Sequence, residues 1–500
     1  MIRALRRSAA ILALAAWGAP LAAQAPREPV ISSAALLADV AILRQAYGEM
    51  HPGLLRYNTP AQLESAYREL EAEFARDRTL ADAYKALSIF LARIRCGHTY
   101  ANFFNQPDDV VAALFQRRTR VPFQFRWVDR RMVVTRSLAA EPALRRGAEV
   151  LAIDGVPVGT ILDSLMRVAR ADGSNDAKRR SDLEVTGASR WEAFDVFHPV
   201  FFPATGDRLT LRVRSAPDAR PVTVTVDAQT AEDRVAQYKA GQGGAQGDTV
   251  TAFTMTYPDA RTAVLRMPTW ALYNSKWDWT AWLHQQFAEL DRRKVRDLIV
   301  DLRENEGGND VGNVILSHLV AADLRLPQYP RLVRYRRASA ELVPYLDTWD
   351  RSFLDWGDQA KGPDAHGFYR LVRYDDGPDG DVIRPTAPRF TGRVLVLVGA
   401  ANSSATFQFA QVIQREKLGR LVGQPTGGNQ RGINGGAFFF LRLPNSHLEA
   451  DLPLIARVAE TAMPDAGLEP DVPVKRTVEG IASGRDEEMA AALALLQRER

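Results

Sequence analysis

The sequence predicts an α/β fold for the second half of the chain, because apolar strands alternate there with helical segments. The segments 297–302 and 394–398 are too apolar for strands that keep one face in water, and they are typical of a parallel sheet buried on both sides. Helical patterns stand at 277–290, 311–321 and 407–418. We therefore expect a sheet covered by helices over residues 250–480.

The composition is that of a globular protein. Of the 500 residues, 46% are hydrophobic and 25% are charged, so extensive disorder is not expected and several domains fit in the length. The formal net charge is only +4, and three of the arginines stand within the first seven residues. Such a balance gives no reason to expect nucleic acid as a partner.

The first 25 residues have the build of a secretory signal. Arginines near the start precede an apolar stretch at 8–21, and Ala23-Gln24-Ala25 offers a small-x-small cleavage site. A membrane anchor is the alternative, but the stretch is shorter than the roughly 20 residues of a span and contains Gly18 and Pro20. We expect export to the periplasm or the medium, with residues 1–25 removed and no stable membrane span left.

Cys96 is the only cysteine, so the fold has no intrachain disulfide and no cysteine-rich metal site. The residue stands at the end of an apolar and basic helical stretch, 91–96. Packing in the core is therefore a better interpretation than a role as nucleophile. The sequence calls for no cofactor.

Two blocks precede the α/β region. Residues 28–110 read as helices, with Leu36, Val40, Leu43 and Tyr47 at helical spacing. From residue 117 to 235 the pattern changes to short strands.

A glycine-led strand at 147–153 enters the turn Asp154-Gly155. This block resembles a PDZ-type module, although residues 170–205 have no place in a minimal PDZ domain. The glycine-rich segment 241–247 is expected to be a flexible linker, and residues 325–390 a long insertion or lid.

A strand that runs into a helix places Ser404 where an acyl-transfer nucleophile is needed. The apolar strand 394–398 is followed by small residues and then by a helical pattern. A serine at such a junction has its hydroxyl near free backbone N–H groups and the positive end of the helix dipole. Simple helix capping by Asn402, Ser403 or Ser404 is the alternative, and on this stretch alone it is the stronger one. The Gly-x-Ser-x-Gly motif is absent.

Two glycine-rich segments follow strands of the same region. The segment 301–309, Asp-Leu-Arg-Glu-Asn-Glu-Gly-Gly-Asn, is predicted to lie at the carboxyl edge of the sheet, where active sites of α/β folds gather. An N–H of Gly307 or Gly308 could complete an oxyanion hole, unless the segment is a plain turn. The segment 426–436 lacks the Gly-Lys-Ser/Thr ending of a phosphate loop.

Taken together, these segments resemble the C-terminal processing, or tail-specific, peptidase family. The resemblance extends from His51-Pro52-Gly53 to the last block, with motifs in the family's order at 301–308, 402–405, 421–428, 443–446 and 467–472. It implies a ClpP/crotonase-like catalytic domain and a peptide or protein substrate. It also implies that Ser404 is the nucleophile and that N–H groups of Ala405 and of Gly307 or Gly308 bind the oxyanion.

One departure from the family decides the expected base. Better-known members pair the serine with a lysine about 25 residues on, a place held here by Asn429. The tricorn-like branch uses a histidine from the helical region instead, and this sequence matches that pattern at His98, within Cys-Gly-His-Thr. A histidine suits a general base. For the third member of the triad the resemblance offers Glu469, with Glu460 as the alternative.

Two other classes of function compete with a peptidase. The missing lysine is consistent with a non-catalytic protein that binds peptides or apolar ligands on a peptidase scaffold. A crotonase-like acyl-CoA enzyme shares the expected core fold, but the export signal and the two preceding blocks disfavour it. The substrate and the oligomeric state do not follow from the sequence.

Overall fold

The computed structural model describes residues 29–187, 189, 191–241, 253–326, 329–374, 382–459 and 461–498. The expected export signal, almost all of the expected linker and Glu460 lie outside these residues. Within them, no helix is both long enough and apolar enough to cross a bilayer.

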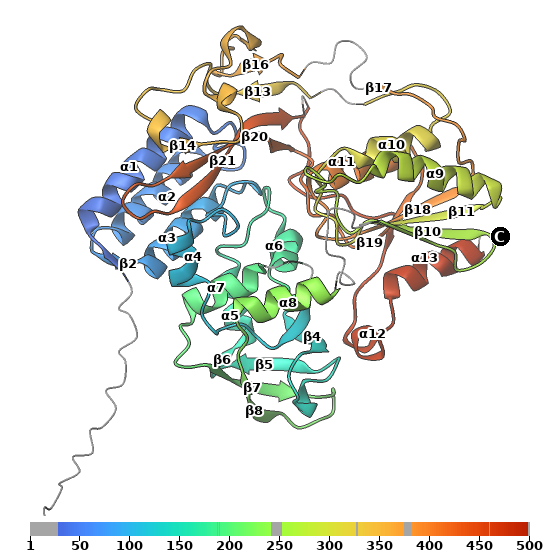
Figure 1. Ribbon diagram of the computed structural model, residues 1–500, viewed down its shortest axis with the longest axis horizontal. Helices are drawn as coiled ribbons and strands as arrows, with labels where there is room; N and C mark the ends of the chain where they lie inside the picture. Colours follow the sequence, from blue (N-terminus) through green and yellow to red (C-terminus); the bar gives the residue numbers. More distant parts are fainter. Residues whose placement is uncertain are drawn as a thin grey trace, which may run out of the picture.

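The α/β region is a six-stranded sheet with the order β22-β19-β18-β11-β10-β9 (Figure 1). All neighbouring strands are parallel except β9, which is antiparallel to β10. The strands are β9 (Thr254–Thr256), β10 (Thr262–Arg266), β11 (Asp297–Asp301), β18 (Arg393–Val398), β19 (Arg420–Gly423) and β22 (Val472–Pro473).

Helices cover both faces of this sheet, which confirms the predicted α/β class. Helices α9 (Trp279–Arg292), α10 (Val311–Leu319) and α11 (Ser404–Arg415) share one apolar core with it. Helix α13 (Glu487–Arg498) packs on the other face. Helix α11 begins three residues before the pattern predicts, because the turn residues 404–406 are small or polar and carry no apolar periodicity.

Helices fill the N-terminal part of the described chain. They are α1 (Ser33–Met50), α2 (Pro60–Glu73), α3 (Leu80–Arg93) and α4 (Asp108–Leu114). The start of α2 is fixed by a capping box, in which Thr59 and Gln62 exchange side-chain and backbone hydrogen bonds. The short strands β1 (Val30–Ile31) and β2 (Arg78–Thr79) pair beside them. Cys96 is buried in this core, as predicted.

A five-stranded antiparallel sheet with the order β3-β4-β5-β7-β8 follows. It lies where the PDZ-like module is expected and consists of β3 (Phe123–Val128), β4 (Arg131–Ser137), β5 (Glu149–Ile153), β7 (Arg208–Arg214) and β8 (Val222–Asp227), with β6 (Val156–Pro157) beside β5. Around it are α5 (Val158–Leu165), α6 (Asp176–Asp182), α7 (Ala193–Phe201) and α8 (Ala231–Gly241). Helices α6 and α7 occupy the segment 170–205, which a minimal PDZ domain does not contain.

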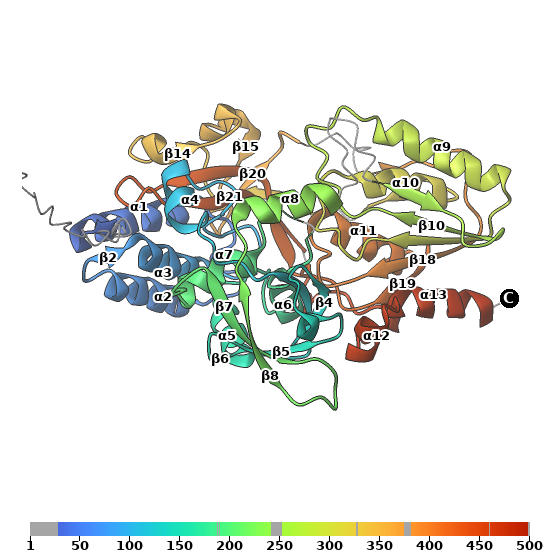
Figure 2. The same cartoon turned by 60° about the horizontal axis from the view of Figure 1, so that its bottom comes forward.

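The described part of the insertion 325–390 supplies strands to a third sheet, with the order β14-β20-β21-β13-β16-β15. Figure 1 and Figure 2 show these strands beside the hairpin of β20 and β21. Its long hairpin is β20 (Gly432–Arg442) and β21 (Glu449–Val458); β13 (Arg331–Val333), β14 (Leu346–Asp347), β15 (Ala360–Lys361) and β16 (Tyr369–Leu371) come from the insertion. This sheet shares one core with the helices α1 to α3 and the five-stranded sheet. The insertion is thus built into the body of the protein.

Candidate active site

The turn after β18 holds Ser404 in a backbone conformation that is unusual for serine. Strand β18 ends at Val398, and α11 begins at Ser404, whose φ is +49°. Residues other than glycine rarely adopt left-handed conformations, and such strain gathers at functional sites. Ser404 thereby stands at the positively polarised end of a 12-residue helix.

The neighbouring side chains brace this turn and do not cap the helix. Ser403, at the N-cap position, makes no capping bond, and its hydroxyl donates to the carbonyl of Glu306 at 3.0 Å. Asn402 is fully buried, and its Nδ2 donates to the carbonyls of Leu302 at 2.5 Å and Asn305 at 2.9 Å. The turn of Ser404 is therefore fastened to the loop after β11.

Gly307 and Gly308 of that loop lie where no side chain fits. A β-carbon on Gly307 would lie 3.0 Å from the backbone nitrogen of Ala405, and one on Gly308 would lie 2.1 Å from the carbonyl oxygen of Trp270. Their φ angles, +110° and +136°, favour glycine as well. The N–H of Gly307 donates to Oδ1 of Asn305 at 2.9 Å, so it is engaged within its own loop.

His98 stands in a turn after α3 that two other side chains hold. Oδ1 of Asp172 accepts a hydrogen bond from the N–H of Gly97 at 3.1 Å, and the hydroxyl of Thr99 lies 2.8 Å from Nε2 of His51. The imidazole of His98 is half-buried, and its Nδ1 has no hydrogen-bond partner among the described residues. Burial lowers the pKa of His98 below 6.5, and the carboxylate of Asp172 opposes this shift. A neutral imidazole can accept a proton.

An arginine joins the turn of His98 to the loop beside Ser404, and a lysine pairs with the same loop. Arg170 donates to the carbonyl of Gly97 at 3.4 Å and to the carboxylate of Glu306 at 3.2 Å. Lys178, on α6, donates to the other carboxylate oxygen of Glu306 at 2.7 Å and reaches the carbonyl of Ala401 at 3.5 Å. The histidine and serine turns thus meet through one bridge of charged side chains.

The charge of Glu306 is fixed by this bridge. The side chain of Glu306 is 49% exposed. Its partial burial would raise its pKa, but Lys178 and Arg170 outweigh this effect and lower the pKa to about 2. Sequence reasoning missed both cations, because they stand in the segment 170–205 that the PDZ resemblance leaves unexplained.

Residues 261–474 match the model of peptidase family S41. This stretch of the chain is thus similar to the serine peptidases of family S41, and we call residues 261–474 the S41 domain. The S41 domain spans the five parallel strands β10, β11, β18, β19 and β22, the hairpin β20–β21 and the described part of the insertion 325–390.

The likeness to solved structures reaches beyond the S41 domain. Mature CPAF in complex with lactacystin has a TM-score of 0.62 at 16% sequence identity, over 93% of this chain and 97% of that one. Mature CPAF without that compound has a TM-score of 0.60 at 17% identity, over the same shares. The photosystem II D1 C-terminal processing protease has a TM-score of 0.39 at 17% identity, over 91% of this chain and 98% of that one. No curated protein sequence matches the chain. The chain and CPAF thus share one overall fold.

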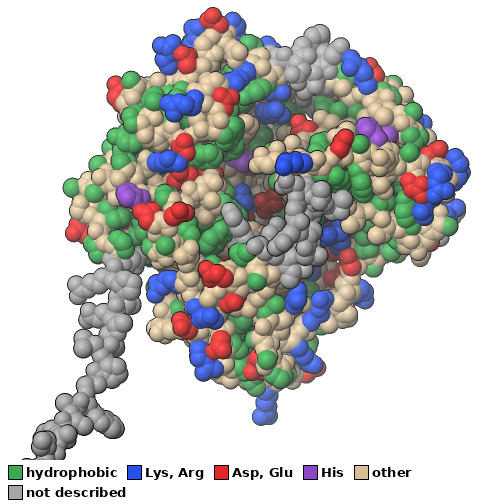
Figure 3. Space-filling model, viewed as in Figure 1, with side chains coloured by type: hydrophobic (Ala, Val, Ile, Leu, Met, Phe, Trp, Pro, Cys, Tyr) green, Lys and Arg blue, Asp and Glu red, His purple; other side chains and the backbone are tan. Residues whose placement is uncertain are grey.

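A cavity opens beside Ser404 in the S41 domain. Ser404, Phe407 and Gln411 line it from one face of α11, and Asp172 and Asn429 line it from other elements. Asn429 stands where better-known members have lysine, and its Nδ2 donates to the carboxylate of Asp465 at 2.7 Å. The face in Figure 3 is hollowed near its centre. Across the described part of the chain, no group of three or more His, Cys, Asp or Glu side chains could hold a metal ion.

The structure does not bring Glu469 to His98. The side chain of Glu469 is exposed, and its carbonyl accepts a hydrogen bond from Gln414 near the far end of α11. The described contacts include none between Glu469 and the histidine turn. Asp172 is the carboxylate that contacts this turn.

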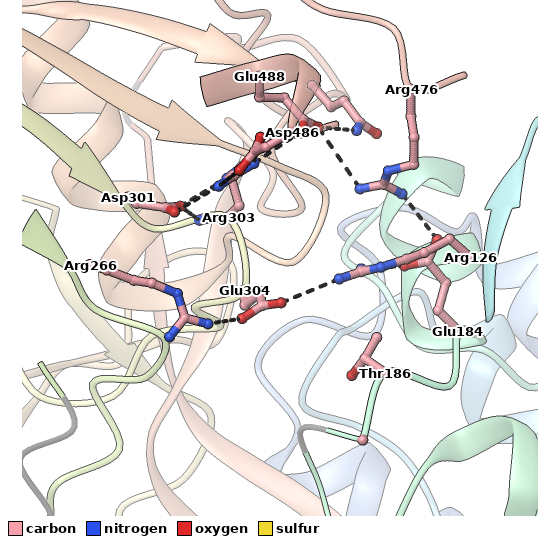
Figure 4. Close-up of polar contacts among 12 residues, drawn as sticks. Arg126, Glu184, Thr186, Arg266, Asp301, Arg303, Glu304, Arg476, Asp486 and Glu488 are labelled. Carbon is pink, nitrogen blue, oxygen red and sulfur yellow. Dashed lines mark hydrogen bonds and ion pairs between the residues drawn. The ribbon is translucent and has the colours of Figure 1, made fainter. Parts of the chain in front are cut away.

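Ion pairs connect the S41 domain with the five-stranded sheet on the other side of the loop after β11. Figure 4 shows Glu304 between Arg266 and Arg126, at 2.6 Å and 3.4 Å. Arg126 also pairs with Glu184 at 2.6 Å, and Glu184 pairs with Arg476 at 3.3 Å. Glu304 stands two positions before Glu306 in the loop after β11. Ion pairs from the S41 domain and from the five-stranded sheet therefore both hold this loop.

Proposed function

We propose that the chain hydrolyses peptide bonds through an acyl-enzyme on Ser404, with His98 as the general base. The observation that carries this proposal is the charged bridge on Glu306, which ties the histidine turn to the loop beside Ser404. His98 removes the hydroxyl proton as Oγ of Ser404 attacks the peptide carbonyl carbon. The imidazolium then gives this proton to the leaving amine, and a water molecule that the same imidazole deprotonates releases the acyl group as a carboxylic acid.

The oxyanion of the tetrahedral intermediate is held by the backbone N–H groups of Ala405 and Gly308. Since the N–H of Gly307 is used by Asn305, Gly308 is the better second donor of the two glycines. The positive end of α11 adds to this stabilisation. Hydrogen bonds between base and nucleophile are often long without substrate, and none joins Ser404 to His98 among the described contacts.

Asp172 orients His98 in this mechanism, in the place that the resemblance gives to Glu469. Its carboxylate is buried and holds the N–H of Gly97, the residue before the histidine. A negative charge at this place stabilises the imidazolium that forms when Ser404 loses its proton.

Lys178 supports the site as a cation and is not the base. Its ammonium donates to Glu306 and lies within reach of the carbonyl of Ala401. An ammonium group that donates to a carboxylate has no lone pair to accept a proton. This distinguishes the proposed Ser-His pair from the serine-lysine pair of other members.

The proposal is tested with Ser404→Ala and His98→Ala, assayed on a denatured protein substrate and on fluorogenic peptides. Each change is expected to reduce hydrolysis by at least about a thousandfold, whereas Ser403→Ala, at the adjacent hydroxyl, retains most of the activity. Stoichiometric labelling by a fluorophosphonate should need Ser404. A folded protein that is neither labelled nor active would instead be a binding protein on a peptidase scaffold.

We propose that the enzyme acts after export, on the strength of the arginines, apolar stretch and small-x-small site in residues 1–25. Mass spectrometry of the protein recovered from a secreting host is expected to show an N-terminus near residue 26. An uncleaved N-terminus on protein retained in the cytoplasm would refute export, without affecting the catalytic proposal.

A further inference from the structure

Three aromatic side chains form an exposed patch next to His98, which we call the aromatic patch: Trp349, Phe438 and Phe440. Trp349 is 60% exposed, an unusual fraction for so large an apolar ring. Its ring centroid lies 5.9 Å from that of Phe438 and 5.8 Å from that of Phe440. Both phenylalanines are half-buried.

Strand β20 fixes these rings on one side of the sheet. Ala437, Phe439 and Leu441 are fully buried, so Phe438 and Phe440 alternate with them and point to the opposite face. Trp349 follows β14, which pairs with β20 at Phe440. The patch is therefore built on a rigid hairpin.

The same strand places the patch relative to the catalytic groups. Gly432 and Ile433, at its start, line the cavity of Ser404. A β-carbon on Gly435 would lie 3.9 Å from Cε1 of His98, and the ring of Phe438 lies 5.8 Å from the imidazole. Along β20 the order is thus the cavity of the nucleophile, then the base, then the aromatic patch.

We infer that the aromatic patch is a substrate subsite that binds an apolar side chain, aromatic or branched aliphatic, on the leaving-group side of the cleaved bond. The inference rests on the proposed function, in which His98 protonates the leaving amine. The aromatic patch lies on the side of His98 that is away from Ser404. It therefore faces the part of the peptide that leaves as the amine.

The spacing of the rings assigns the position in the peptide. The ring of Phe438 lies 5.8 Å from the imidazole of His98, and that of Trp349 lies 5.9 Å from Phe438. An extended peptide advances about 3.3–3.6 Å per residue. We therefore assign the patch to the second and third residues after the cut. Aromatic rings favour a ring or a branched chain in stacked or edge contact, and a carboxylate at the same place would lose hydration without gaining a partner.

The test uses a fluorogenic peptide that the enzyme cleaves, made in two forms. One form carries Phe and the other Asp at both the second and the third position after the cut. Wild type is expected to prefer the Phe form, and Trp349→Ala to reduce the ratio of the two kcat/KM values by about tenfold. Trp349→Phe should retain most of the ratio. Val222→Ala, at an exposed apolar residue of the five-stranded sheet, should retain all of it.

Binding to Ser404→Ala gives a readout that does not depend on turnover. Calorimetry should show the Phe form binding about tenfold more weakly after Trp349→Ala is added to Ser404→Ala. An unchanged ratio in the kinetic assay, or equal binding of the Phe and Asp forms, would overturn the subsite. Cleavage that survives Ser404→Ala would instead refute the proposed mechanism, so the two failures can be told apart.

Discussion

Asn402 makes three hydrogen bonds at the turn that carries the nucleophile. Its Nδ2 donates to Leu302 and Asn305, its Oδ1 accepts from Gly399 at 2.8 Å, and the residue is fully buried. Asn402→Ala leaves buried backbone groups without partners, so we expect the free energy of unfolding to fall by about 3 kcal/mol. Urea denaturation measures this. Ser403→Ala removes one bond from a more exposed group, and should cost less than about 1 kcal/mol.

In the proposed mechanism, we expect His98 and Asp172 together to set the pH below which the enzyme loses activity. A general base must be neutral, so kcat/KM is expected to be full at high pH and to fall as the pH drops through the pKa of His98. Burial places that pKa below 6.5, while the charge of Asp172 raises it. Asp172→Asn should therefore move the acid limb to lower pH and reduce kcat on the order of a hundredfold.

A pH–rate profile separates this role from a structural one. The amide of Asp172→Asn can still accept the hydrogen bond of Gly97, so the fold should persist. Asp176→Asn, in the same segment, removes an exposed carboxylate that pairs with the largely buried Arg179 at 2.9 Å, and should leave the acid limb in place. A limb that does not move after Asp172→Asn would remove Asp172 from the mechanism.

At the scale of elements, the segment from Arg170 through α6 holds the loop after β11 by charge. Lys178 is 5% exposed but its partner Glu306 is 49% exposed. Glu306→Gln keeps the shape and leaves the ammonium without a counter-charge, so we expect a loss of about 1–2 kcal/mol after allowing for screening by water.

The stability difference should depend on pH in a defined direction. The folded pKa of Glu306, about 2, is depressed from 4.5. The stabilisation is therefore complete above about pH 4.5 and is lost as the pH falls toward 2. Urea denaturation of wild type and Glu306→Gln at pH 7, 4 and 2.5 tests this. Glu304→Gln serves as the control, because the arginines that pair with Glu304 are themselves partly exposed. If the stability difference between wild type and Glu306→Gln is the same at all three pH values, the assignment is contradicted.

The elements that sequence predicts are those whose signal is local. The buried strands β11 and β18 and the small-residue turn before α11 can be recognised from a few consecutive residues, and they place Ser404 correctly at the start of a helix. His98 needed the family resemblance, because one histidine in a turn has no local signal. Arg170 and Lys178 could not be found at all, because their partner Glu306 is more than 100 positions away.

At the scale of the whole molecule, the two turns that carry the proposed catalytic pair belong to different cores. Cys96, beside His98, is buried with the N-terminal helices, the five-stranded sheet and the hairpin β20–β21. Ala405, beside Ser404, is buried in the core of the parallel sheet. In the proposed mechanism, activity therefore depends on how the two bodies are held against each other. Sequence patterns describe each body separately. They do not describe how the bodies are aligned, because polar contacts between distant segments determine the alignment.

The ion pair of Arg126 and Glu304 is one of the contacts that hold the two bodies together. Arg126→Gln also deprives the buried Glu184 of a partner, so a double-mutant cycle with Glu304→Gln is needed to isolate the pair between the bodies. Because both partners are partly exposed, we expect a coupling free energy of about 0.5 kcal/mol, measured from kcat/KM at low salt. It should vanish near 1 M NaCl, where the screening length falls to about 3 Å. A coupling that is absent already at low salt would mean that this ion pair does not help to align the two bodies, and one that persists near 1 M NaCl would mean that the pair is not screened by solvent.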